Sequence, residues 1–96
     1  MQAVVRTYSG KGAKELFDIL EKHKAEVDKL LQSVQGLVSY TLARSGDGGV
    51  SVTVCQDKAG IDQYMQLAKD WIAKNGAGTG AAAPQVSEGA VIIQKK

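Results

Sequence analysis

The spacing of apolar and turn-forming residues divides this chain of 96 residues into six segments. Alternation of apolar and polar residues predicts a strand from Gln2 to Ser9. Apolar residues three and four positions apart then predict a helix from Ala13 to Val34. Two further strands are expected at 37–45 and 50–56, joined by the glycine-rich turn 46–49.

The second half of the chain continues the alternation of helix and strand. Asp57 can cap a second helix that runs to about Asn75. The loop 76–85 consists mostly of Gly, Ala and Thr, so we expect it to be flexible. A last strand is predicted from Val86 to Gln94, and its run Val91–Ile93 indicates central or partner-covered packing.

The order strand, helix, strand, strand, helix, strand restricts the architecture of the chain. Split strand–helix–strand connections place both helices on one face of a four-stranded antiparallel sheet. The length allows a single α+β domain over residues 1–96 and no second core. The opposite face of the sheet must then meet solvent, a ligand or a partner.

The hairpin at 46–49 decides which side chains share a face of the sheet. A two-residue turn at 47–48 sets Val52 opposite Ala43, whereas an odd-length loop sets Val52 opposite Leu42. We favour the odd-length loop because it segregates polarity better, and a slip of one residue moves every side chain across the sheet. It leaves a small, polar set on the open face: Ser39, Thr41, Ala43, Ser51, Thr53 and Cys55.

Charge and composition exclude several classes of function. The net charge of +2 is too small to indicate binding to nucleic acid or to an anionic membrane. Residues 50–55 lack the aromatic side chains with which RNA-recognition modules stack bases. The single cysteine, Cys55, permits no intrachain disulfide, which fits a reducing compartment. Residues 1–6 do not resemble a signal peptide and no apolar run is long enough to span a membrane, so we expect a cytoplasmic protein.

Four residues are candidates for contacting a small-molecule ligand. Arg6 and Tyr8 share one face of the first strand, where they can hold an anionic or phenolic molecule. His23, the only histidine, falls on the apolar stripe of the first helix and can act as a general base. Trp71, at the margin of the second helix's stripe, can stack on an aromatic substrate.

Each candidate also has a structural explanation, which is the commoner one for such positions. Arg6 and Tyr8 can form a solvated or interface-facing pair on the sheet. His23 and Trp71 can pack against neighbouring side chains or a second subunit. One histidine and one cysteine cannot supply the three or four ligands of a zinc site, so we expect no metal. We expect no cofactor, and the sequence assigns no catalytic residue.

The segment Gly36–Leu42 follows a long amphipathic helix and precedes the hairpin Gly46–Gly48. In this arrangement the chain resembles the dimeric α/β-barrel proteins, and among them the small domains similar to antibiotic-biosynthesis monooxygenases (ABM-like domains). The resemblance implies a ferredoxin-like βαββαβ fold and a homodimer. The haem-degrading branch uses an Asn near the end of the first strand. Residues 6–8 stand there in this chain, which argues against haem degradation.

Three functions are compatible with these observations. The leading hypothesis is a stand-alone homodimer of uncharacterised function that binds a small aromatic or carbonyl-containing molecule in a cavity lined by the sheet. The second, implied by the resemblance, is a cofactor-independent monooxygenase-like enzyme on aromatic or quinol substrates. In that enzyme Arg6, Tyr8 or His23 would assist proton transfer. The third is a non-enzymatic structural or regulatory dimer, which is favoured if no pocket exists.

Overall fold

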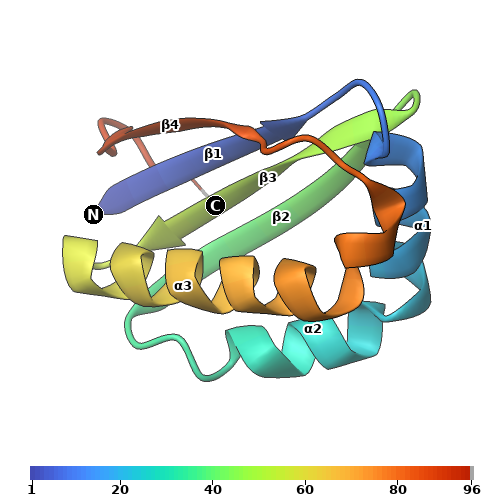
Figure 1. Cartoon of the computed structure of the whole chain (residues 1–96). Helices are drawn as coiled ribbons and strands as arrows, with labels where there is room; N and C mark the ends of the chain where they lie inside the picture. The colour runs from blue at the N-terminus through green and yellow to red at the C-terminus, as the bar shows by residue number, and fades with distance from the viewer. Residues whose placement is uncertain (96) are drawn as a thin grey trace.

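The computed structural model describes residues 1–95, which form one sheet with all helices on one side (Figure 1). Neighbouring strands run antiparallel in the order β2-β3-β1-β4. This is the α+β, ferredoxin-like architecture that the element order predicts. The elements are β1 (Gln2–Tyr8), α1 (Ala13–Lys22), α2 (Lys24–Leu31), β2 (Leu37–Ser45), β3 (Gly48–Cys55), α3 (Lys58–Asn75), the 3₁₀ turn η1 (Ala77–Thr79) and β4 (Gln85–Ala90).

The turn of the β2–β3 hairpin is shorter than the polarity pattern indicated. It contains two residues, 46–47, and it sets Val52 opposite Thr41. The next glycines belong to β3. A β-carbon at Gly49 would collide with the Phe17 ring and with a backbone carbonyl of β2. The odd-length loop favoured from the sequence is therefore wrong, and so is the alternative turn one residue later.

In this register the side chains of β3 point to the faces of the sheet opposite to those expected. Ser51, Thr53 and Cys55 are buried on the side that the helices cover. The open face instead carries valines of β1 and β3: Val5, Val50, Val52 and Val54. The polarity pattern was misleading because these small polar residues are buried beneath the helices, where Ser51 lines a cavity described below, and do not mark solvent exposure.

The long helix expected over Ala13–Val34 is interrupted. At His23 the backbone leaves helical geometry, with φ −108° and ψ 23°, and this residue separates α1 from α2. The apolar spacing continues across the break and no proline or glycine marks it, so sequence periodicity does not detect it. Helix α2 ends at Leu31, before the predicted Val34, and its C-cap Gln32 has right-handed geometry. The sequence predicts that Gly36 ends the helix as a left-handed cap. Its φ of +71° is left-handed, but the residue lies in the loop beyond the helix end.

The last strand ends at Ala90, four residues before its predicted end. The amide of Val91 still donates to the carbonyl of Met1 at 3.0 Å, and the chain then leaves the sheet. Ile92 and Ile93 are 94% and 82% exposed. Because β4 is an edge strand, the central packing predicted for this apolar run is wrong. Its cover by a partner stays a prediction.

Helix α3 begins and ends as predicted. The carboxylate of Asp57 accepts a hydrogen bond from the amide of Gly60 at 3.2 Å and so caps the helix. Ile61, Tyr64 and Trp71 are buried, which places Trp71 inside the protein and not at the margin. Within residues 1–95, no helix has the length and apolar character needed to cross a membrane.

The core between the sheet and the helices consists of two clusters. One is built around Val4 and the other around Tyr8, two residues of β1 that point to the same side. The first cluster contains Val4, Leu31, Val34, Cys55, Ile61 and Tyr64, and the second contains Tyr8, Ala13, Leu16, Phe17, Leu20 and Trp71. Arg6 lies between these two anchors in β1, so a charged residue separates the clusters.

The close approach at Gly49 gives a test of the register. In Gly49→Ala the added methyl group has no space between Phe17 and β2, so we expect the free energy of unfolding to fall by about 1–3 kcal/mol. Gly89→Ala in β4 is the matched control because its β-carbon meets nothing within 4 Å. Urea denaturation measures both variants. Equal stabilities for the two would contradict the packing of α1 against β3.

Candidate ligand-binding site

One rung of the sheet crosses the middle of the helix-facing surface. Leu42 of β2, Ser51 of β3, Arg6 of β1 and Val86 of β4 lie next to one another in register. Residues paired in this way point to the same face of an antiparallel sheet. The rung therefore carries one short polar residue and one long cation between two apolar ends.

A cavity of about 40 Å³ lies over this rung, between the sheet and all three helices. We call it the inner cavity. Its volume is enough for a few water molecules and too small for an organic ligand. Aliphatic side chains of α1, α2 and α3 form much of its wall, and its aromatic and polar lining residues are Arg6, Tyr8, Tyr40, Ser51, Tyr64 and Trp71.

Two larger grooves adjoin the inner cavity at the two ends of the rung. The β4 groove, of about 350 Å³, lies between α3, β4 and residues 81–84, and it shares Arg6 and Tyr8 with the inner cavity. The β2 groove, of about 520 Å³, lies between β2 and helices α1 and α2, and it shares Tyr40 and Leu42. Both volumes are within the usual range for small-molecule sites.

Arg6 is the most unusual residue of this region. Arg6 is only 3% exposed, and its Nε has no hydrogen-bond partner within residues 1–95. Among the described residues it forms no ion pair with a carboxylate. Its guanidinium carbon lies 5.5 Å from the centre of the Tyr8 ring, a cation–π contact. A buried cation without a counter-charge is costly to the fold, which makes it a candidate for ligand binding.

Other polar groups around the inner cavity are only partly satisfied. The indole Nε1 of Trp71 is buried without a hydrogen-bond partner among the described residues, as is Thr53 Oγ1 on the neighbouring rung. Ser51 Oγ lies 3.3 Å from the hydroxyl of Tyr64, within hydrogen-bonding distance. Two of the three unsatisfied groups, on Arg6 and Trp71, therefore belong to the cavity lining.

The tyrosines near Arg6 are neutral at physiological pH. Burial raises the pKa of Tyr8 to about 12, although the Arg6 guanidinium acts in the opposite direction. Burial and the neighbouring Tyr64 also raise the pKa of Tyr40. These phenols can donate hydrogen bonds, but they supply no negative charge to Arg6 and no base at neutral pH.

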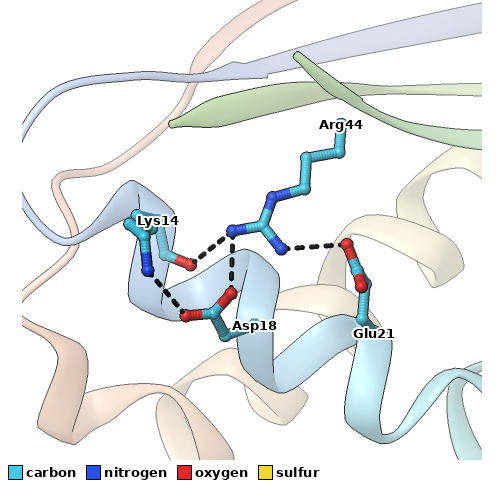
Figure 2. Close-up of polar contacts among 4 residues, drawn as sticks. All are labelled: Lys14, Asp18, Glu21 and Arg44. Carbon is cyan, nitrogen blue, oxygen red and sulfur yellow. Dashed lines mark hydrogen bonds and ion pairs between the residues drawn. The ribbon is translucent and has the colours of Figure 1, made fainter. Parts of the chain in front are cut away.

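At the mouth of the β2 groove, Arg44 connects β2 to α1 (Figure 2). Its guanidinium donates to Asp18 Oδ1 at 2.8 Å, to Glu21 Oε1 at 2.9 Å and to the carbonyl of Lys14 at 3.2 Å. The hydrogen bond from Arg44 holds the pKa of the Asp18 carboxyl below its usual range. Arg44 is thus paired with two carboxylates, in contrast to Arg6.

Three of the four predicted ligand-binding residues come together. Arg6, Tyr8 and Trp71 all line the inner cavity. His23 does not line it. Its ring packs edge-on against Trp71 at a centroid distance of 6.2 Å, and its Nδ1 lies 3.5 Å from a carboxylate oxygen of Glu26. Among residues 1–95, no group of three or more His, Cys, Asp or Glu side chains is placed to hold a metal ion.

The sequence did not indicate the other lining residues. Tyr40 and Ser51 were assigned to opposite faces of the sheet because of the wrong register, whereas both face the helices. Tyr64 is buried on α3, where its helical spacing predicts core packing and nothing more. Lys69, in the β4 groove, carried no pattern at all, because its approach to Arg6 depends on how α3 crosses β1 and β4.

Comparison with known proteins supports the fold of the chain but assigns it to no family. No protein-family model and no curated protein matches the sequence. Among solved structures, NE2512 of Nitrosomonas europaea, a protein of unknown function, matches with a TM-score of 0.71 and 16% identity over 99% of this chain and 91% of that chain. A dimeric ferredoxin-like protein from an uncultured marine organism matches with a TM-score of 0.65 and 20% identity over 98% and 95%.

A third similar structure is SnoaB of Streptomyces nogalater, a cofactor-independent oxygenase. Its TM-score is 0.58, with 18% identity over 97% of this chain and 93% of that chain. The chain therefore shares the ferredoxin-like fold of these structures, as its sequence predicted. At these identities the similarity extends to the fold and not to the activity.

The isolation of Arg6 predicts an unusual response to mutation. Arg6→Met keeps the length of the side chain and removes the buried, unpaired charge, so we expect the free energy of unfolding to rise by about 1–3 kcal/mol. Urea denaturation measures the change. Arg44→Met is the control, because it removes an arginine that is hydrogen-bonded to two carboxylates, and it should not stabilise the protein. A marked loss of stability in Arg6→Met would show that Arg6 has a structural role.

Proposed function

We propose that this protein binds a small aromatic molecule between the sheet and the helices, in the β4 groove beside Arg6 and the inner cavity. The observation that supports this most directly is the buried Arg6 side chain. It lines both the inner cavity and the β4 groove, and it lacks a carboxylate partner among the described residues. Proteins rarely retain such a group for stability, since it costs free energy unless something pairs with it.

The walls of this site suit a ligand with a flat apolar body. Leu16, Met65 and Ile72 contribute aliphatic surface to the β4 groove, and the backbone there is lined by small residues at 81–84. The volume of about 350 Å³ is at the lower end for small-molecule sites and fits one or two rings. Tyr8 and Trp71 offer ring surfaces on the inner side.

The positions of the candidate proton carriers favour binding over oxygenation. Burial raises the pKa of Tyr8 to about 12, so its hydroxyl is protonated at neutral pH. His23 lines neither the inner cavity nor the β4 groove. A general base must reach the proton that it removes and must be in its basic form. The oxygenase alternative has similarity of fold alone in its favour, to SnoaB and to a monooxygenase of Streptomyces coelicolor.

The same proposal includes a homodimer formed through the open face of the sheet. That face carries Val5, Val50 and Val52, and all the helices lie on the other side (Figure 1). Ile92 and Ile93, which follow β4, are themselves almost fully exposed. Covering these side chains with a second copy removes apolar surface from water, and the similar marine protein is a dimeric ferredoxin-like protein.

Binding can be followed through Trp71, the only tryptophan in the chain. We expect aromatic compounds of one or two rings to change its emission in a saturable manner, because this residue lines the inner cavity. In Ala83→Trp a large ring fills the β4 groove, so calorimetric titration should show affinity reduced by at least about tenfold. Calorimetry is used here because this variant contains a second indole.

The control for that variant is Ala77→Trp, since Ala77 is exposed in η1 and lines neither the grooves nor the inner cavity. It should bind like the wild type. If no aromatic compound binds the wild-type protein, or if both variants bind equally well, the proposed site is wrong.

The dimer is tested by light scattering at micromolar concentration. We expect twice the chain mass of 10.1 kDa for the wild type. Val52→Lys places a charge at the centre of the open face and should give the single-chain mass. Gln32→Lys, an exposed position at the end of α2, should leave the mass unchanged. A single-chain mass for the wild type would contradict the dimer.

A further inference from the structure

We propose that the ligand is an organic monoanion whose carboxylate binds the Arg6 guanidinium from the β4 groove; this rests on the proposed function. The β4 groove brings together two cations, Arg6 from β1 and Lys69 from α3. Among the described residues, the linings of this groove and of the inner cavity include no Asp or Glu. The site therefore has a positive charge that its own walls do not balance.

The nearby acidic residue of β4 does not change this balance. Glu88 follows two residues after Val86, the register partner of Arg6, and so points to the same side of the sheet. Its carboxylate accepts a hydrogen bond from Lys58 Nζ at 3.1 Å, and Lys58 also donates to Asp62 at 3.2 Å. Glu88 is thus paired with a lysine of α3, and the partner of Arg6 must come from elsewhere.

The phenols beside Arg6 cannot balance its charge either. Burial raises the pKa of Tyr8 to about 12 and raises that of Tyr40, so both are neutral over the physiological range. Neutral hydroxyls are suited to donating hydrogen bonds to a bound oxygen atom. Together with the unpartnered indole NH of Trp71, they favour a ligand that carries hydrogen-bond acceptors at the end facing Arg6.

The number and depth of the cations favour a carboxylate over a phosphate dianion. Only one of the two cations, Arg6, is buried, whereas Lys69 is exposed. One buried charge is neutralised by a ligand with a single negative charge, and a second charge would be desolvated without compensation. The planar fork of a guanidinium also matches a carboxylate in two parallel hydrogen bonds.

The test compares two probes of nearly equal shape, 2-naphthoate and its neutral amide 2-naphthamide, by calorimetric titration of the wild-type protein. We expect 2-naphthoate to bind at least about tenfold more tightly, because hydrogen bonds between charged groups are the stronger ones. In Arg6→Gln this preference should disappear. Lys69→Gln should weaken naphthoate binding only a fewfold, and Lys74→Gln, an α3 lysine outside this groove, should leave it unchanged.

The outcomes separate this inference from the proposed function. Equal binding of both probes by the wild type overturns the anionic ligand and leaves the aromatic site in place. Failure of both probes to bind overturns the inference and counts against the proposed function. A preference for naphthoate that persists in Arg6→Gln, with wild-type circular dichroism, overturns the role of Arg6. If Arg6→Gln does not fold, the comparison of probes on the wild type and on Arg6→Met decides.

Discussion

The proposed ligand site depends on the buried, unpaired charge of the Arg6 guanidinium. In β1 it lies between Val4 and Tyr8, each of which anchors one of the two core clusters. A hydrophobic residue at this position would join the clusters into one core and fill the space over Ser51. The fold instead keeps a cation there, 3% exposed, beside a cavity and a groove. The loss of core stability is intelligible if the charge serves to hold a ligand.

The two faces of the sheet carry different kinds of side chain. On the helix-facing side, the short Ser51 of β3 lies beneath the inner cavity, and aromatic residues of β1, β2 and α3 line that cavity. On the open side, β1 and β3 carry valines that the helices do not cover. A ligand site inside one chain and a partner surface outside it are therefore compatible, because they occupy opposite faces of the same strands.

Much of the fold could be predicted from the sequence, because apolar periodicity and turn residues are local signals. Asp57 and Asn75 mark the two ends of α3 as the sequence indicated. The hairpin register was missed because a polarity argument assumes that polar side chains face water, whereas Ser51 and Thr53 face the helices. Arg6, Tyr8 and Trp71, which the sequence offers as candidates by residue type, line one cavity, and their role in binding stays a prediction. Their assembly around one cavity, and the separation of His23 from it, depend on tertiary packing that no local pattern encodes.

A crystal structure of the protein grown with 2-naphthoate tests whether Arg6 holds a ligand carboxylate. We expect the carboxylate of the probe within hydrogen-bonding distance of the Arg6 guanidinium and its rings in the β4 groove. We also expect that no protein carboxylate, from this chain or from a second copy, pairs with Arg6. A structure in which a carboxylate of a partner subunit reaches Arg6, with the β4 groove closed, would show that Arg6 serves the dimer and not a ligand.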